Sequence, residues 1–175
     1  RELADKTLGI VGYGELGRRV ARVAEAFGMR VLLAQRPGAA EPEEGRVPLP
    51  ILLPRVDVLS LHCPLTPETR GLIGPWELAL MRRDAILINT ARGGLVDEAL
   101  LADALRKGAL GGAGVDVLSL EPPTAGNPLL APDIPNLIVT PHSAWGSRES
   151  RQRLIGQLAE NIQGYLDGEP VRTVG

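Results

Sequence analysis

The chain contains 175 residues with a formal net charge of -2 and a hydrophobic content of 44%, which is typical of one globular domain that buries its own core. No apolar run approaches the roughly 20 residues that span a bilayer, and no signal-peptide pattern is present, so we expect no membrane association. The nearly balanced charge gives no reason to expect a nucleic acid partner. A single cysteine, Cys63, excludes an internal disulfide and suits a reducing cytoplasm. With only 2 histidines besides, we expect no metal site.

A glycine-rich turn follows the first predicted strand. Residues 7–11 form a β-rich apolar run, and Gly12, Gly14 and Gly17 come directly after it. In a strand-to-helix turn, the first glycine permits the tight bend, the second lets a pyrophosphate approach the backbone, and the third lets helix and strand pack closely. Apolar residues from Val20 to Phe27 then recur at helical spacing, so the helix would point its N-terminus at the phosphates. The motif predicts a dinucleotide site, with a glycine turn that binds nothing as the alternative.

Strand and helix patterns alternate along the rest of the chain, as in a parallel sheet covered by helices on both faces. Further strands are expected at residues 30–34, 56–61, 85–89, 113–117 and 137–140. Residues 35–55 are rich in proline and glutamate, which predicts a loop with one short helical turn. Helices are expected to begin at Thr66 as N-cap, to cover 75–81, to run from the cap Asp97 to Gly108, and to cover 147–166. The fold class is therefore α/β, a Rossmann-type doubly wound parallel sheet, as a single domain over residues 1–175.

The last predicted helix, residues 147–166, carries one apolar stripe that nothing in the local sequence covers. The stripe consists of Leu154, Ile155, Leu158, Ile162 and Tyr165. Part of it could pack on the sheet, but its length and position suggest a further partner.

Polar residues follow each predicted strand, where parallel α/β sheets bind their ligands. Three of them, Arg92, Glu121 and His142, together suit the interconversion of a 2-oxo acid and a 2-hydroxy acid. The guanidinium of Arg92 offers two hydrogen bonds to a carboxylate. His142 can exchange the hydroxyl proton as general acid and base. If Glu121 bonds the other imidazole nitrogen, it fixes the tautomer and favours the imidazolium.

Each of these residues also has a plainer interpretation. Arg92 could be a surface arginine, Glu121 a loop carboxylate and His142 a structural histidine, and only their occurrence together favours a catalytic site. His62 and Cys63, which follow the third strand, are expected to be structural, and no environment that would lower the thiol pKa of Cys63 is evident.

Five motifs carry a family resemblance over nearly the whole chain: GYGELG, LHCPLTPETRGLI, LINTARGGLVDE, GVDVLSLEPP and PHSAW. In this order they resemble the nucleotide-binding domain of the D-specific 2-hydroxyacid dehydrogenases, and within that family the glycerate dehydrogenases or hydroxypyruvate reductases. The resemblance implies that Arg92 binds substrate, that Glu121 partners the acid/base His142, and that Trp145 borders the substrate. It implies a cofactor site made of Gly12, Tyr13, Gly14, Glu15, Leu16, Gly17, Gln35, Arg36, His62, Cys63, Pro64, Thr69, Asn89, Thr90, Ala91, Arg92, Asp116, His142 and Ala144, with Asp116 on the nicotinamide carboxamide.

The resemblance also implies a substrate-binding domain that this chain lacks, toward which the helix at 147–166 would return. We therefore expect a domain that is inactive alone, in an enzyme for small 2-oxo or 2-hydroxy acids. The resemblance further implies a homodimer, and the single cysteine favours a cytoplasmic location.

The cofactor is NAD or NADP, and Gln35 leaves the choice open. An acidic residue at this position would bind the ribose hydroxyls and repel a 2′-phosphate. Gln35 cannot repel a phosphate and Arg36 could attract one, so we favour NAD or the use of both. Two alternative functions are an NAD(H)-sensing module and another dehydrogenase of the family, such as phosphoglycerate dehydrogenase. A hydrolase that uses bound NAD would need a lysine at the cleft, and Lys6 and Lys107 are the only lysines.

Overall fold

The computed structural model describes residues 2–39, 41 and 43–173. Within it the chain forms two compact units, which divide between Pro141 and His142. Each unit is described by itself below.

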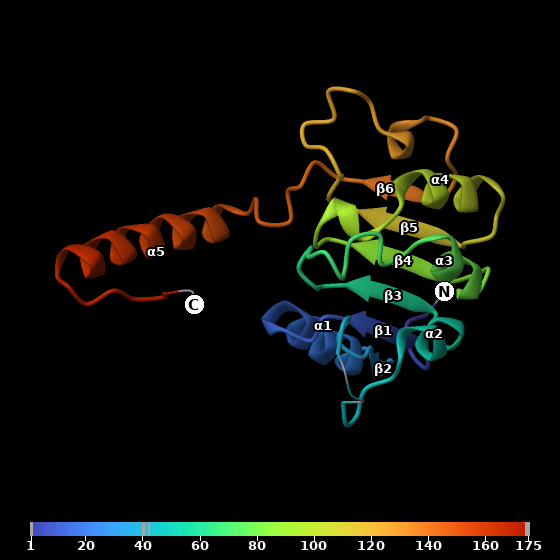
Figure 1. The fold of residues 1–175 in the computed structure, drawn as a ribbon, viewed down its shortest axis with the longest axis horizontal. Coiled ribbons are helices and arrows are strands. Elements are labelled where there is room, and N and C mark those ends of the chain that lie inside the picture. Colours follow the sequence, from blue (N-terminus) through green and yellow to red (C-terminus); the bar gives the residue numbers. More distant parts are fainter. Residues whose placement is uncertain (1, 40, 42, 174–175) are drawn as a thin grey trace. The chain divides into compact units, whose positions relative to one another are not determined.

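The first unit is built on a sheet of six parallel strands. Figure 1 shows them side by side in the order β2, β1, β3, β4, β5, β6. Their bounds are Thr7–Val11 for β1, Arg30–Leu33 for β2, Val58–Leu61 for β3, Ile86–Asn89 for β4, Gly112–Val115 for β5 and Leu137–Val139 for β6. The doubly wound parallel sheet predicted from the sequence is confirmed, with strand ends that differ from the prediction by at most two residues.

An isolated bridge extends the sheet beyond β2. Val47 pairs in parallel with Ala34. Its amide donates to the Leu33 carbonyl at 2.8 Å, and its carbonyl accepts the Gln35 amide, also at 2.8 Å. With Val47 counted as a one-residue third strand, the spatial order becomes 3-2-1-4-5-6-7, and its first six strands have the order of dinucleotide-binding sheets. The winding direction reverses between β1 and β3, so the crevice at the ends of these two strands is the expected ligand site.

Helices and single turns of 3-10 helix connect the strands. In the first unit they are α1 Glu15–Ala26, α2 Leu49–Leu52, α3 Pro75–Leu80 and α4 Glu98–Arg106, with η1 Leu53–Arg55, η2 Gly93–Leu95 and η3 Pro128–Leu130. The predicted cap of α4 is confirmed, because the Asp97 carboxylate accepts the Leu100 amide at 3.0 Å. Gly108 ends this segment in the left-handed region at φ +61.

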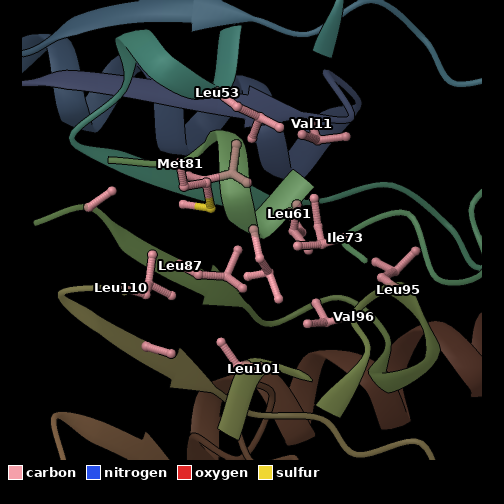
Figure 2. Packing of buried hydrophobic residues seen from close by; sticks show 14 of the residues in the cluster. Val11, Leu53, Leu61, Ile73, Met81, Leu87, Leu95, Val96, Leu101 and Leu110 are labelled. Atoms are coloured by element: carbon pink, nitrogen blue, oxygen red, sulfur yellow. The ribbon is translucent and has the colours of Figure 1, made fainter. Parts of the chain in front are cut away.

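Two hydrophobic clusters cover opposite faces of the sheet, as the alternation of β1 requires. Leu8 and Ile10 pack with Ala21 and Ala24 of α1 in the smaller cluster. The larger cluster joins the central strands to α4, and Figure 2 shows side chains such as Leu61, Leu87 and Leu101 converging in it. These clusters hold the sheet rigid below the strand ends where the polar residues lie.

The face that α1 buries is made of small residues. Gly17, Ala21 and Ala24 are buried, whereas Val23 and Phe27 are 56% and 60% exposed. Small side chains let α1 approach β1 closely, as the third glycine of the turn predicted. Val23 and Phe27 of the same periodic pattern therefore face outward, whereas Val20 is partly buried and packs against the smaller cluster.

The helix predicted to begin at Thr66 is absent, and this prediction was wrong. Residues 67–71 form a turn instead. The Thr69 hydroxyl accepts the Thr66 amide at 2.7 Å and donates to the Pro64 carbonyl at 2.7 Å. Gly71, at φ +64, then redirects the chain. One helical bond forms, from the Arg70 amide to the Thr66 carbonyl at 2.9 Å, but the Gly71 amide then donates to the Gly94 carbonyl at 2.8 Å and the helix does not continue.

The second unit consists of a loop, the helix α5 Arg148–Leu166 and a C-terminal segment. The Ser147 hydroxyl caps α5 by accepting the Ser150 amide at 3.1 Å. No residue of α5 is buried, and the apolar stripe is exposed, with Leu158 at 58% and Ile162 at 54%. None of the helices in the described ranges has the length and apolar character that crossing a membrane requires.

Candidate functional site

The glycine turn at the end of β1 lies against the loop that follows β3. Gly12 has φ +93, and a Cβ atom there would stand 2.5 Å from the Cys63 nitrogen. Gly14 is the N-cap of α1, and a Cβ atom there would meet nothing within 4 Å. The space above Gly14 and the free amides of the first turn of α1 fit a pyrophosphate.

A cavity of about 460 Å³ opens at this turn. Its wall is the glycine turn together with the loops after β2 and β3, and it is lined by Gly12, Tyr13, Gly14, Arg36, Pro37, Arg46, Cys63, Pro64, Thr66, Glu68 and Thr69. A second cavity of about 260 Å³ shares Arg36 and Pro37 with it and includes Gln35. The volumes suit an extended, dinucleotide-sized ligand along the ends of β1, β2 and β3.

Two arginines and one carboxylate meet at the end of β2. The Glu43 carboxylate accepts the Arg36 amide at 2.9 Å, and it pairs with the guanidinium groups of Arg36 at 3.5 Å and Arg46 at 3.3 Å. Arg46 also donates to the Ala34 carbonyl at 3.2 Å. The Gln35 side chain donates to the Glu41 carbonyl at 3.0 Å. This end of the cavity therefore has two positive groups with one internal counter-charge.

Burial shifts the pKa of both ionisable residues that directly follow β3, His62 and Cys63. The His62 imidazole bonds the Ser60 hydroxyl at 2.9 Å, and desolvation lowers the pKa of His62. Desolvation raises the pKa of the Cys63 thiol, and Cys63 is buried, so it stays protonated and unreactive. Both observations agree with the structural roles expected for these residues.

The loop after β4 is held by Asn89. Its side-chain amide donates to the Arg92 carbonyl at 2.9 Å, and its oxygen accepts the Ala91 amide at 3.1 Å. The Arg92 side chain is exposed and donates to the Ala91 carbonyl at 2.6 Å. The loop thereby presents the Arg92 guanidinium beyond the strand end. Thr90 lies between Asn89 and the two residues whose backbone Asn89 binds.

The loop after β5 packs directly on the Arg92 loop. A Cβ atom on Gly93 would lie 2.0 Å from the Leu118 carbonyl carbon and 2.3 Å from the Ser119 nitrogen. The Leu118 amide donates to the Glu121 carboxylate at 2.7 Å. Two of the predicted catalytic residues, Arg92 and Glu121, therefore sit on loops in backbone contact. Gly93 is the residue that makes this contact possible.

Asp116 lies at the start of the same loop and is buried. Its amide donates to the Asn89 carbonyl at 3.0 Å, and its carboxylate accepts a hydrogen bond from the Thr140 hydroxyl. The strand ends β4, β5 and β6 are thus tied together at the residue expected to bind the carboxamide.

His142, Ala144 and Trp145 belong to the second unit. His142 has φ +51, and its carbonyl accepts the indole N–H of Trp145 at 2.8 Å. The indole of Trp145 is 55% exposed. The structure thus orders Trp145 locally against the backbone of His142, and the catalytic pairing of His142 with Glu121 stays a prediction.

Several lining residues were not found from the sequence. Arg46, Thr66 and Glu68 line the larger cavity, but Arg46 lies in a stretch interpreted only as loop, and the others were assigned to a helix start. Among the predicted cofactor residues, Glu15, Leu16 and Gly17 form the first turn of α1. These three, and the loop residues Asn89, Thr90 and Ala91, lie outside the cavity lining. No group of three or more metal-ligating side chains occurs among the residues that the structure describes.

A parallel sheet with a glycine turn and a lined cavity at its reversal point defines a dinucleotide-binding α/β domain. Comparison with known proteins gives the same result, because the model of the D-isomer specific 2-hydroxyacid dehydrogenase NAD binding domain matches residues 1–144. The chain belongs to this family.

Known relatives are similar in sequence to almost the whole of this chain. It is 51% identical over 173 residues to a glycerate dehydrogenase of Methylorubrum extorquens, covering 99% of this chain and 54% of that protein. It is 43% identical over 176 residues to a hydroxypyruvate reductase of Blautia hydrogenotrophica, covering 99% and 54%. A D-isomer specific 2-hydroxyacid dehydrogenase from Lactobacillus delbrueckii ssp. bulgaricus, solved in its NAD complexed form, superposes with a TM-score of 0.85 at 31% identity, covering 100% of this chain and 57% of that one. The chain thus spans about half the length of these relatives.

Proposed function

We propose that this chain is the cofactor-binding half of an NAD(P)-dependent oxidoreductase that reduces hydroxypyruvate and similar 2-oxo acids, such as glyoxylate, to D-2-hydroxy acids. The observation that carries the proposal is the contact of Gly93 with Leu118, which joins the loop of Arg92 to the loop of Glu121. An arginine and a carboxylate on contacting loops, at the same edge of the sheet as the dinucleotide cavity, suit carboxylate binding and proton transfer. The similarity to the glycerate dehydrogenase supports the choice of substrate.

In this proposal each residue has one task. Arg92 binds the substrate carboxylate with two parallel hydrogen bonds and orients the neighbouring carbonyl. His142 donates a proton to the carbonyl oxygen as negative charge develops there, and Glu121 keeps the imidazole charged and correctly turned. Asp116 binds the carboxamide of the cofactor. Bound NADH or NADPH supplies the hydride.

The direct test is an assay of the full-length enzyme with hydroxypyruvate, glyoxylate and 3-phosphohydroxypyruvate, followed by the loss of NADH or NADPH absorbance. We expect hydroxypyruvate to have the highest kcat/KM. A preference for the phosphorylated substrate would instead identify a phosphoglycerate dehydrogenase. Binding of the dinucleotide with no turnover of any 2-oxo acid would favour the alternative of an NAD(H)-sensing module.

The cofactor preference follows from the end of β2. Gln35 does not repel a 2′-phosphate, whereas Glu43 already occupies the charged groups of Arg36 and Arg46. We therefore propose that NAD binds more tightly than NADP but that both bind. Calorimetric titration of the chain with each dinucleotide measures the two affinities.

We also propose that the protein is cytoplasmic and homodimeric. The single cysteine, Cys63, suits a reducing compartment, and the exposed apolar stripe of α5 favours association. Sedimentation at increasing protein concentration tests the homodimer, and a monomer at the highest concentration would contradict it.

A further inference from the structure

A buried carboxylate outside the predicted site organises the loop that carries Glu121. Glu98 is the first residue of α4 and is only 9% exposed. Its Oε1 accepts the Ser119 amide at 2.6 Å. Its Oε2 accepts the Ser119 hydroxyl at 2.6 Å and the side-chain amide of Asn127 at 2.7 Å. Three donors from one loop therefore converge on one side chain, a larger set than a helix cap requires.

The position of Ser119 connects this carboxylate to the site. The amide of Leu118 binds Glu121 at 2.7 Å, and the next amide, that of Ser119, binds Glu98. The peptide unit between them is the one that Gly93 contacts. Two carboxylates thus hold two successive amides, and the backbone they share lies against the Arg92 loop.

The three donors from Ser119 and Asn127 need a carboxylate at position 98, and the side-chain amide of a glutamine could not accept all of them. The Asn127 oxygen accepts the Leu129 amide at 2.9 Å, which directs its NH2 group toward Glu98. A glutamine at position 98 would therefore turn its own NH2 group toward one of the donors and lose that hydrogen bond. Charged acceptors form the stronger hydrogen bonds, and the N-terminus of α4 favours the negative charge.

We propose that Glu98 is a positioning residue for the reaction: through Ser119 it sets the Leu118 backbone and with it the orientation of the Glu121 carboxylate toward its partner. The inference rests on the proposed function, because Glu121 is the group through which Glu98 acts. It predicts that Glu98 changes the proton-transfer step and leaves dinucleotide binding nearly unchanged, since Glu98 is absent from the cavity lining.

The test compares Glu98→Gln with the matched control Glu77→Gln in the full-length enzyme. Glu77 also lies in the first turn of a helix and accepts a backbone amide, that of Gly74 at 3.1 Å, but it is on α3. Glu98→Gln should lower kcat for hydroxypyruvate reduction about tenfold, the effect of one lost hydrogen bond to a charged group. KM for NADH should stay unchanged, and the alkaline limb of the kcat profile should move to lower pH. Glu77→Gln should leave kcat and its pH profile at the wild-type values.

A double variant shows whether Glu98 acts through Glu121. In an enzyme that already carries Glu121→Gln, adding Glu98→Gln should not move the pH profile further. An equal additional shift there, or a wild-type profile for Glu98→Gln alone, overturns the proposal. Ser119→Ala, which removes only the hydroxyl, serves if Glu98→Gln does not fold, and it should shift the profile in the same direction by a smaller amount.

Hydrogen exchange separates this inference from the proposed function. If the wild-type enzyme reduces none of the 2-oxo acids, the proposed function fails. The amides of Leu118 and Ser119 still report on positioning, and Glu98→Gln should accelerate their exchange at least tenfold relative to Glu77→Gln. Unchanged exchange rates overturn the role of Glu98 whatever the activity.

Discussion

A Cβ atom on Gly17 would lie 2.2 Å from the carbonyl oxygen of Gly12, so these two glycines of the turn touch, while the third faces open space. Gly17 is therefore needed for the close packing of α1 on β1, and Gly12 for the close approach of the loop after β3, where its Cβ atom would stand 2.5 Å from the Cys63 nitrogen. Gly14 is free to meet a ligand, and the three positions make separable predictions.

Gly14→Val should fold normally and lose measurable binding of NADH, because its side chain would fill the space meant for the pyrophosphate. Gly17→Val should be destabilised by about 1–3 kcal/mol or more, as overpacked positions are. Thermal unfolding and calorimetric titration measure the two effects. Gly156→Ala in α5, where a Cβ atom meets nothing within 4 Å, is the control and should keep both stability and affinity. Wild-type affinity in Gly14→Val would mean that the phosphate site lies elsewhere.

Two substitutions at the end of β2 should change cofactor preference in opposite directions. Gln35→Asp places a carboxylate near the ribose, so the ratio of NAD to NADP affinity should rise. Glu43→Gln releases the guanidinium groups of Arg36 and Arg46, so this ratio should fall. Titration of each variant with both dinucleotides gives the ratios. If neither ratio changes, the residues at the end of β2 do not recognise the 2′-position of the ribose.

The stability of the chain should decrease as the pH falls below about 6.5, the ordinary pKa of the histidine side chain. The folded pKa of His62 is lowered by burial, so the unfolded chain takes up its proton first and is favoured as the pH falls from 6.5 toward the folded pKa. Urea titrations from pH 8 to pH 5 measure the effect, which His62→Gln should remove.

Asp133 provides a contrast in a separate pH range. Its hydrogen bonds from Arg106 lower its pKa, so its contribution to stability is complete above the ordinary value of 3.8 and is lost only below it. Asp133→Asn should therefore leave the slope between pH 8 and pH 5 as it is in the wild type. A slope that persists in His62→Gln would assign the effect to other groups.

Arg92→Lys in the full-length enzyme should raise KM for hydroxypyruvate much more than it lowers kcat, because an ammonium cannot form the paired hydrogen bonds of a guanidinium. Steady-state kinetics at saturating NADH separates the two constants. Arg83→Lys, on an exposed arginine that bonds the Gly108 carbonyl, is the matched control. Equal KM values in wild type and Arg92→Lys would place the substrate carboxylate on another group.

His142→Ala should lower kcat by about 10² to 10⁴ fold, the usual contribution of general acid catalysis, with little change in cofactor affinity. Glu121→Gln keeps the size of the side chain but loses the charge that favours the imidazolium. Reduction requires the protonated imidazole, so the alkaline limb of its kcat profile should move to lower pH. A pH profile identical to the wild type in Glu121→Gln would contradict the pairing of these residues.

Much of the sheet could be predicted from local patterns, whereas one loop could not. The run of residues 7–11 and the glycines after it specify β1 and the start of α1, because strand periodicity and the need for positive φ are properties of a few neighbouring residues. The segment from Thr66 to Thr69 has a helix-start pattern of the same quality and forms a turn. There the Gly71 amide bonds the Gly94 carbonyl of another loop, a long-range contact that the local pattern does not contain.

The sequence by itself determined the family, the order of the strands and of all helices but the one expected at Thr66, and the candidates Arg92, Glu121 and His142. Only the tertiary structure showed that Gly93 seats the Leu118 backbone, that Glu43 neutralises two arginines, and that Glu98 binds Ser119, 21 residues away. The physical reason is the separation along the chain over which each interaction acts. Periodicity and capping arise within one or two turns of chain, but the contacts of Gly93 and Glu98 exist only after parallel strands have brought their carboxyl-end loops to one edge of the sheet. The ion pairs of Glu43 depend on the irregular path of the loop after β2.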